Sequence, residues 1–177
     1  KQRYAGLTNP TVTDKQSLLN KGLAAAQAGS AFYADAVVLL PQMKLTEAKV
    51  SEVKGYILDE KAGIAERKVY LGEAKTELEV KQQADPSDTT IAKQVELVNK
   101  QITNVGLYEA YITELDADII KDWSYTQGQT VESKGQIIAR KQALTEKELA
   151  YWADTVRLNS ELIANNSVMI GMDLGYW

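Results

Sequence analysis

One seven-residue repeat constrains this chain more than any other feature of its sequence. Its apolar members are Val50, Ile57, Ile64, Leu71 and Leu78. A repeat this regular over five members is typical of a long helix that packs along one side against another helix. The position that a leucine zipper would fill with a second apolar series is mixed instead: Val53, Glu60, Arg67 and Ala74. We therefore do not expect a simple two-stranded zipper.

The same predicted helix carries a second stripe of small or apolar residues, about 120° around its axis from the first. The stripe comprises Gly55, Leu58, Ala62, Ala65, Val69 and Gly72. Lysines and acids repeat with the same spacing: Lys54, Lys61, Lys68 and Lys75, and Glu52, Asp59, Glu66 and Glu73. Two apolar faces favour a helix inside a multi-helix bundle, or one that packs on a hairpin partner and also on a neighbouring subunit. The candidate interface residues on this stripe are Leu58, Ala65, Val69 and Gly72.

Residues 52–67 and 132–147 resemble each other, which indicates an internal duplication. Six of the sixteen aligned positions are identical: Glu52/Glu132, Lys54/Lys134, Gly55/Gly135, Ile57/Ile137, Lys61/Lys141 and Glu66/Glu146. A turn that contains proline precedes each unit, at 9–11 and at 85–87. We predict two tandem helical hairpins at 13–84 and 85–168, an irregular arm at 1–12, and an apolar, aromatic tail at 169–177.

Helix breakers divide the chain into four predicted helices, at about 13–40, 45–83, 88–125 and 131–166. Pro41 ends the first helix, the segment 84–88 ends the second, and the segment 126–129 ends the third. The last of these breaks is compatible with a turn or with a kink. No segment alternates for long enough to predict a strand. We predict an all-α fold in which the two hairpins form an elongated four-helix bundle; the alternative is one continuous extended stack.

The composition argues against several classes of function. The chain has no histidine and no cysteine, so it contains no Ser-His-Asp triad, no thiolate nucleophile and no zinc motif built on histidine. A net charge of −4 and a pI near 5.0 argue against nucleic acid as a partner, because nucleic acid requires clustered basic side chains. The longest uncharged run, 22–34, is too short to cross a bilayer. We expect no enzyme, no nucleic-acid partner and no membrane partner.

Three carboxylates near the end of the third predicted helix are the best candidates for a metal site: Asp116, Asp118 and Asp122. Spacings of two and four residues do not bring three side chains onto one helical face. We interpret these carboxylates as part of a solvated face, and we interpret the acidic cluster at 85–88 as a helix cap. We therefore expect neither a metal ion nor a cofactor.

Tyrosine and tryptophan are concentrated in the second half of the chain. Both favour interfaces, because each has a large apolar body and one polar atom. The remaining candidate interface residues are Trp123, Tyr125 and Trp152, and, in the tail, Met169, Met172, Tyr176 and Trp177. Two alternatives stay open: the aromatic residues wedge between helices of the bundle, and the tail folds back on its own protein.

Long helices with extra apolar stripes and no catalytic residues are typical of building blocks. We expect a non-enzymatic structural subunit that associates with itself or with other assembly proteins. A virion component, a surface filament or a secretion-type machine would each fit. The alternatives are a soluble helical adaptor that binds one protein partner and a helical bundle that binds a lipid surface. The sequence leaves the compartment open, and an extracellular location or a place within a virion would suit it.

Overall fold

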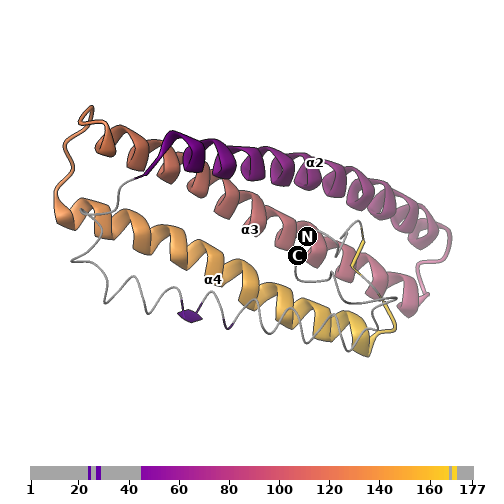
Figure 1. Cartoon of the computed structure of the whole chain (residues 1–177). Helices are drawn as coiled ribbons and strands as arrows, with labels where there is room; N and C mark the ends of the chain where they lie inside the picture. Colours follow the sequence, from indigo (N-terminus) through magenta and orange to yellow (C-terminus); the bar gives the residue numbers. More distant parts are fainter. Residues whose placement is uncertain (1–23, 25–26, 29–44, 168, 171–177) are drawn as a thin grey trace, which may run out of the picture.

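A computed structural model describes residues 24, 27–28, 45–167 and 169–170. It contains three long helices: α2 at Glu47–Ala84, α3 at Thr89–Thr126 and α4 at Lys134–Ala164. The fold is all-α, and none of the residues in these ranges forms a strand. The helices run side by side, and α3 packs against both α2 and α4 (Figure 1). At 1.5 Å per residue, α2 and α3 are each about 57 Å long.

Each of the three helices begins and ends within three residues of its predicted bounds. Of the predicted first helix, 13–40, only Ala24, Gln27 and Ala28 are described, and all three are helical. The predicted arm at 1–12 lies outside the described residues. Of the predicted tail, Met169 and Ile170 alone are described.

Side-chain caps set where the helices begin. Thr46 accepts a hydrogen bond from the backbone N–H of Lys49 at the start of α2. Asp88 accepts from Thr90 and Ile91 at the start of α3, as the predicted cap requires. Ser133 forms a capping box with Gln136 at the start of α4, which satisfies two further backbone N–H groups.

The break between α3 and α4 is a turn, which decides the alternative that the sequence left open. The N–H of Gly128 donates to the carbonyl of Tyr125, and the N–H of Gln129 donates to that of Ser124. Gly128 has a φ of 69°, a left-handed conformation that glycine adopts without steric cost. The chain then crosses residues 129–133 before Ser133 caps α4.

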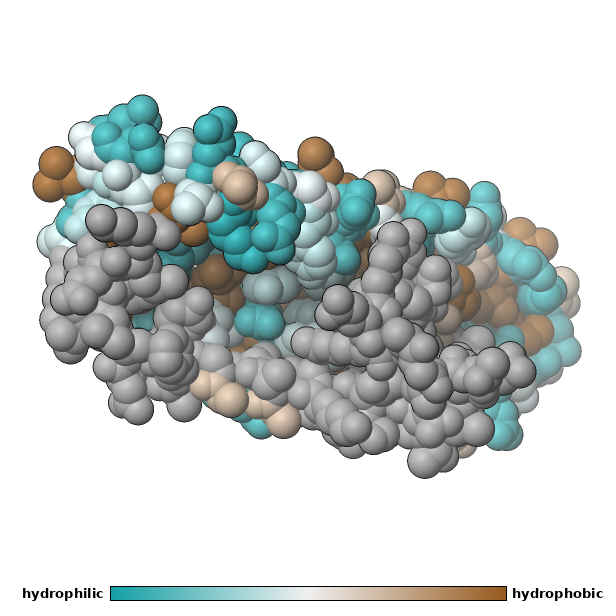
Figure 2. All heavy atoms as spheres, viewed as in Figure 1, coloured by the Kyte–Doolittle hydropathy of each residue, from teal (hydrophilic) through white to brown (hydrophobic). Residues whose placement is uncertain are grey.

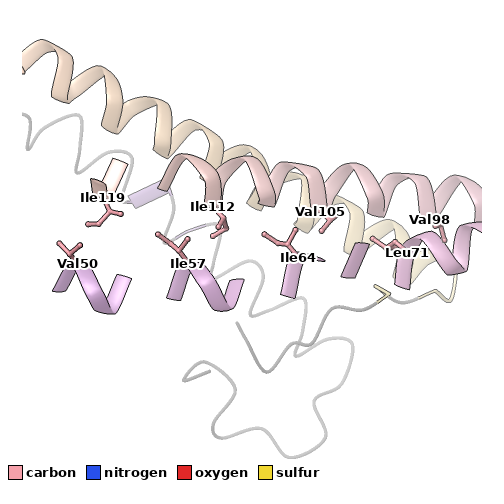
Figure 3. Packing of buried hydrophobic residues seen from close by; sticks show 8 residues of the cluster. All are labelled: Val50, Ile57, Ile64, Leu71, Val98, Val105, Ile112 and Ile119. Atoms are coloured by element: carbon pink, nitrogen blue, oxygen red, sulfur yellow. The ribbon is translucent and has the colours of Figure 1, made fainter. Parts of the chain in front are cut away.

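The predicted seven-residue repeat forms the apolar seam between α2 and α3. Its buried members on α2 face a matching series on α3, in the order Val50–Ile119, Ile57–Ile112, Ile64–Val105 and Leu71–Val98 (Figure 3). The two series run in opposite directions with the same step, so one antiparallel register satisfies every pair. Leu78 packs at the margin of this cluster. The sequence prediction of a packed face is confirmed.

The seam between α3 and α4 mixes apolar and polar residues. On α4 the buried apolar series is Ile137, Leu144, Tyr151 and Leu158. The Tyr151 ring stacks on Tyr108 of α3, with 4.5 Å between ring centroids. Farther along, Leu158 and Leu162 pack on Leu97.

The apolar seam should carry a large part of the stability. Ile112 on α3 is fully buried, whereas Ile120 on the same helix is 45% exposed. We expect Ile112→Ala to lower the free energy of unfolding by about 2–5 kcal/mol, since it leaves a cavity in the core. The matched variant Ile120→Ala should cost under about 1 kcal/mol. Urea denaturation followed by circular dichroism measures both, and equal costs would contradict this account of the core.

Candidate functional site

The side of α2 that points away from the core is a continuous uncharged strip, here called the outer face. It consists of Gly55, Leu58, Ala62, Ala65, Val69, Gly72, Thr76 and Val80, all of them exposed. Its large side chains are open to solvent: Leu58 is 67% exposed, Val69 57% and Val80 61%. In Figure 2, apolar residues reach the surface along the upper edge of the molecule, where α2 runs. The outer face contains the predicted interface residues Leu58, Ala65, Val69 and Gly72, and their role in binding stays a prediction.

Two columns of opposite charge border the outer face. The lysine column, Lys54, Lys61, Lys68 and Lys75, lies between this face and the apolar seam. Lys61 forms an ion pair with Asp116 of α3, and Lys68 forms one with Glu109 of α3 at 2.5 Å. The ammonium groups of Lys61 and Lys68 thus lie along the α3 side of the outer face, whereas Lys75 pairs with Glu79 of α2 itself at 3.7 Å.

The acid column, Glu52, Asp59, Glu66 and Glu73, borders the other edge of the outer face. Its described contacts stay within α2: Glu52 pairs with Lys49 at 3.0 Å, and Glu66 accepts a hydrogen bond from Tyr70 at 2.9 Å. All four acids are exposed. The outer face therefore has a basic edge that is tied to α3 and an acidic edge that is directed toward solvent.

A buried polar layer on the opposite side of α2 holds the three helices together. The Arg67 guanidinium is 5% exposed and donates to Asn104 Oδ1 through both terminal nitrogens, at 3.4 Å each. Asn104 Nδ2 in turn donates to Asp154 Oδ2 at 3.0 Å and to Thr155 Oγ1 at 2.8 Å. Burial lowers the pKa of Arg67. The layer links α2 to α3 and α3 to α4 by hydrogen bonds. It therefore holds α2, which carries the outer face, in one position relative to the other two helices.

The start of the predicted tail lies against the same polar layer. The N–H of Ile170 donates to Gln101 Oε1 at 2.6 Å, and its carbonyl accepts from Arg67 Nε at 3.4 Å. Met169 packs against the cluster that contains Leu97 and Leu158. Residues 169–170 therefore fold back on their own protein, which is the alternative that the sequence left open for the tail. Met172, Tyr176 and Trp177 lie outside the described residues.

The other aromatic candidates lie mainly between helices. Trp152 is buried and contacts Tyr151, with 5.6 Å between ring centroids. Trp123 is half-buried and packs at the margin of the α2–α3 seam, and Tyr125 is half-buried near the end of α3. The positions of Trp123 and Trp152 match the alternative in which aromatic residues wedge between helices.

A cluster of charged side chains lies inside the α3–α4 seam, and the sequence analysis missed it. Arg140 pairs with Asp118, with Asp122 at 2.8 Å and with Glu132 at 2.7 Å. Lys141 pairs with Asp118 and Asp122. Burial alone would lower the pKa of Arg140, but the hydrogen bonds that it donates to Glu132 and Asp122 and the charge of Asp118 raise the pKa overall.

The interpretation of Asp118 as part of a solvated face was therefore wrong. Its side chain is 4% exposed and is enclosed by Arg140 and Lys141. Asp116 lies elsewhere on α3 and pairs with Lys61. A usable signal was present in the spacing, because Asp118 and Asp122 are four residues apart and therefore share one face of α3.

The charged side chains of this cluster neutralise one another. Within the described ranges, no three acidic side chains are grouped so that they could hold a metal ion, and the buried carboxylates are neutralised by Arg140 and Lys141. None of the helices that the structure describes has the length and apolar character needed to span a membrane. No protein-family model, no curated protein and no solved structure matches the chain.

The buried charge cluster should be sensitive to the loss of one partner. Arg140→Met would leave the carboxylates of Asp118, Asp122 and Glu132 with one lysine, and we expect a loss of about 3–5 kcal/mol in the free energy of unfolding. The control is Arg157→Met on the same helix, since Arg157 pairs with Asp154 but its side chain is 58% exposed. That variant should cost at most about 1 kcal/mol. Chemical denaturation compares the two variants. A cost for Arg140→Met as small as that of the control would contradict the stabilising role of Arg140 in the buried charge cluster.

Glu60 should make stability depend on pH. Burial raises the pKa of Glu60 above its ordinary value of 4.5, and the hydrogen bond from Tyr108 offsets only part of the rise. The contribution of Glu60 to the free energy of unfolding is then fully present below pH 4.5, and it is lost as the pH rises through the raised pKa. We expect Glu60→Gln to gain stability relative to the unchanged protein across that interval. Urea titrations at a series of pH values test this, and pH profiles that run parallel for the two proteins would exclude it.

Proposed function

We propose that this chain is a non-enzymatic structural subunit that associates with itself, or with other assembly proteins, through the outer face of α2. The observation that carries the proposal is the outer face itself: an exposed, uncharged strip on a helix whose other side is already committed to the core. A virion component, a surface filament or a secretion-type machine would each use such a subunit. The proposed location is extracellular or within a virion.

The size of the outer face suits a helix-sized partner. From Gly55 to Val80 the strip is about 38 Å long. Each of the side chains Leu58, Val69 and Val80 would contribute about 1–2 kcal/mol to the free energy of association when a partner covers it. The small residues between them let a second helix approach closely. An isolated exposed leucine needs no explanation, but a continuous strip over several helical turns favours an interaction surface.

The proposal includes the architecture that the internal repeat predicts, namely two duplicated hairpins packed as a four-helix bundle. Two pairs of equivalent positions make similar contacts, which supports a common origin, although the Lys61 side chain is 44% exposed and that of Lys141 only 9%. Ile57 and Ile137 are both buried, and Lys61 and Lys141 both pair with aspartates of α3. In this architecture the fourth helix would come from 13–40, of which the structure describes Ala24, Gln27 and Ala28.

The C-terminal tail is the second contact surface in the proposal. Because Met169 and Ile170 pack on their own bundle, they anchor the chain at the point where the tail leaves α4. We propose that the part beyond them, with Met172, Tyr176 and Trp177, contacts neighbouring subunits in the assembly. Its aromatic residues offer the combination of apolar area and polar atoms that interfaces favour.

The proposal predicts association that depends on the outer face. The purified chain should sediment above its monomer mass of 19.5 kDa in a concentration-dependent way. The double variant Leu58→Asn, Val69→Asn should shift it toward monomer, since polar amides replace the apolar contacts without changing charge. The matched control Ile120→Asn, Ile163→Asn changes two exposed apolar residues outside the outer face and should leave association unchanged.

Sedimentation equilibrium distinguishes these cases. An unchanged chain that stays monomeric at about 100 μM would rule out self-association through this face, because the free energy of association would then be weaker than about −5.5 kcal/mol. A monomer that binds one foreign helix would point instead to the adaptor alternative.

A further inference from the structure

The outer face of α2 has the register of a coiled-coil face in its own right. Counted along this face, position a is held by Gly55, Ala62, Val69 and Thr76, and position d by Leu58, Ala65 and Gly72. The next d position is Glu79, so the uncharged register ends at Thr76, and Val80 falls at position e. Each member of the lysine column directly precedes an a residue, so the lysines occupy position g. Each acid from Asp59 onward directly follows a d residue, so the acids occupy position e. Positions e and g are the ones that select the partner and the orientation of a coiled coil.

We propose that two copies of this chain pair through the outer face of α2 as parallel helices in register, with the lysine column of each copy against the acid column of the other. This inference rests on the proposed function and specifies the partner, the direction and the register. Its occupant is a second copy of this chain, because the face carries both halves of a complementary charge pattern.

The parallel arrangement pairs three members of each column, whereas Lys75 at one end faces Val80 and Glu52 at the other end faces Glu47. In a parallel pair, a g residue faces the e residue five positions later in the other helix. Lys54 then faces Asp59 of the second copy, Lys61 faces Glu66, and Lys68 faces Glu73. A two-fold axis repeats each contact, which is the self-complementary arrangement that a homodimer needs.

The antiparallel arrangement brings like charges together. There, g faces g and e faces e, so lysine columns would meet each other along one edge and acid columns along the other. Such contacts destabilise the wrong partner or orientation. The charge pattern therefore excludes the antiparallel pair as well as favouring the parallel one.

Ion pairs within the single chain already position two side chains of the lysine column. The ion pairs of Lys61 with Asp116 and of Lys68 with Glu109 hold these side chains along the edge of the outer face. Both lysine side chains are still 44% exposed, and an ammonium group has three donors. Each lysine can therefore bind its α3 carboxylate and a carboxylate of the second copy together.

Cysteine cross-linking tests direction and register directly, because the chain has no cysteine of its own. Gly55 and Gly72 lie near the two ends of the a and d register, about 25 Å apart, and a Cβ atom added at either one meets nothing within 4 Å. In the full-length chain, Gly55→Cys alone and Gly72→Cys alone should each give a disulfide-linked dimer under mild oxidation. Val131→Cys, at a position that is 97% exposed and outside the face, controls for random collision.

A charge-reversal variant tests the columns. Asp59→Lys, Glu66→Lys, Glu73→Lys makes both edges basic, and we expect the dissociation constant of the dimer to rise on the order of a hundredfold. The control Glu77→Lys, Glu96→Lys, Glu146→Lys changes the net charge equally at exposed acids outside the two columns. It should change the dissociation constant by less than about threefold. Equal weakening in both variants would overturn the pairing of the columns.

The outcomes separate this inference from the proposed function. If neither single variant cross-links but a mixture of the two does, the helices pair in the antiparallel direction; the inference is then wrong, while self-association through the outer face stands. If the unchanged chain is monomeric, the parallel pair and self-association through the outer face are both wrong. If both single variants cross-link and the charge reversal weakens the dimer, the parallel pair is established.

Discussion

The structure depends on one antiparallel seam between α2 and α3. Along it, two apolar series with the same seven-residue step meet in a single register, from Val50 opposite Ile119 to Leu71 opposite Val98. Neither segment would stay helical over its full length on its own in water, because an isolated helix gains little from its own hydrogen bonds. Burial along this seam fixes the rotation of α2 about its axis. It also determines that the opposite side, with Leu58 and Val69, lies in solvent.

The second seam, between α3 and α4, holds its register by a different means. Leucine and isoleucine tolerate sliding, but a hydrogen bond or ion pair does not. Asn104 meets Thr155 at one level and Asp118 meets Lys141 at another. Moving α4 by one helical turn would break both contacts and leave buried charges unpaired, which costs more than the pairs contribute to stability. We interpret these polar levels as the feature that selects one alignment of α4 among several that apolar packing alone would allow.

The sequence predicted much of this architecture and little of its polar interior. Helix bounds followed from local signals such as Asp88 and Gly128, and the apolar seam followed from one periodic series, because both depend on residues near in the chain. The environment of Asp118 depends on which residues of α4 lie opposite it, and that is set by the α3–α4 register. Periodicity likewise identified the stripe of Leu58 and Val69 but left open whether it was internal, since a bundle helix and an interface helix have the same pattern. Exposure separates the two, and exposure requires the fold.

The arrangement of charge around the outer face is the strongest reason to assign it a partner. Solubility alone is served by lysines and acids that are intermixed, and the C-terminal end of α2 has such a mixture, as in the pair Lys81–Glu77. Beside the outer face the signs are instead sorted, lysines on the α3 side and acids on the other, through successive heptads. Stability of the single chain accounts for Lys61 and Lys68, which pair with α3, but it gives no reason for the acids to gather on the far edge. A second copy of the same surface does give that reason, because only a partner with both columns meets each edge with the opposite charge.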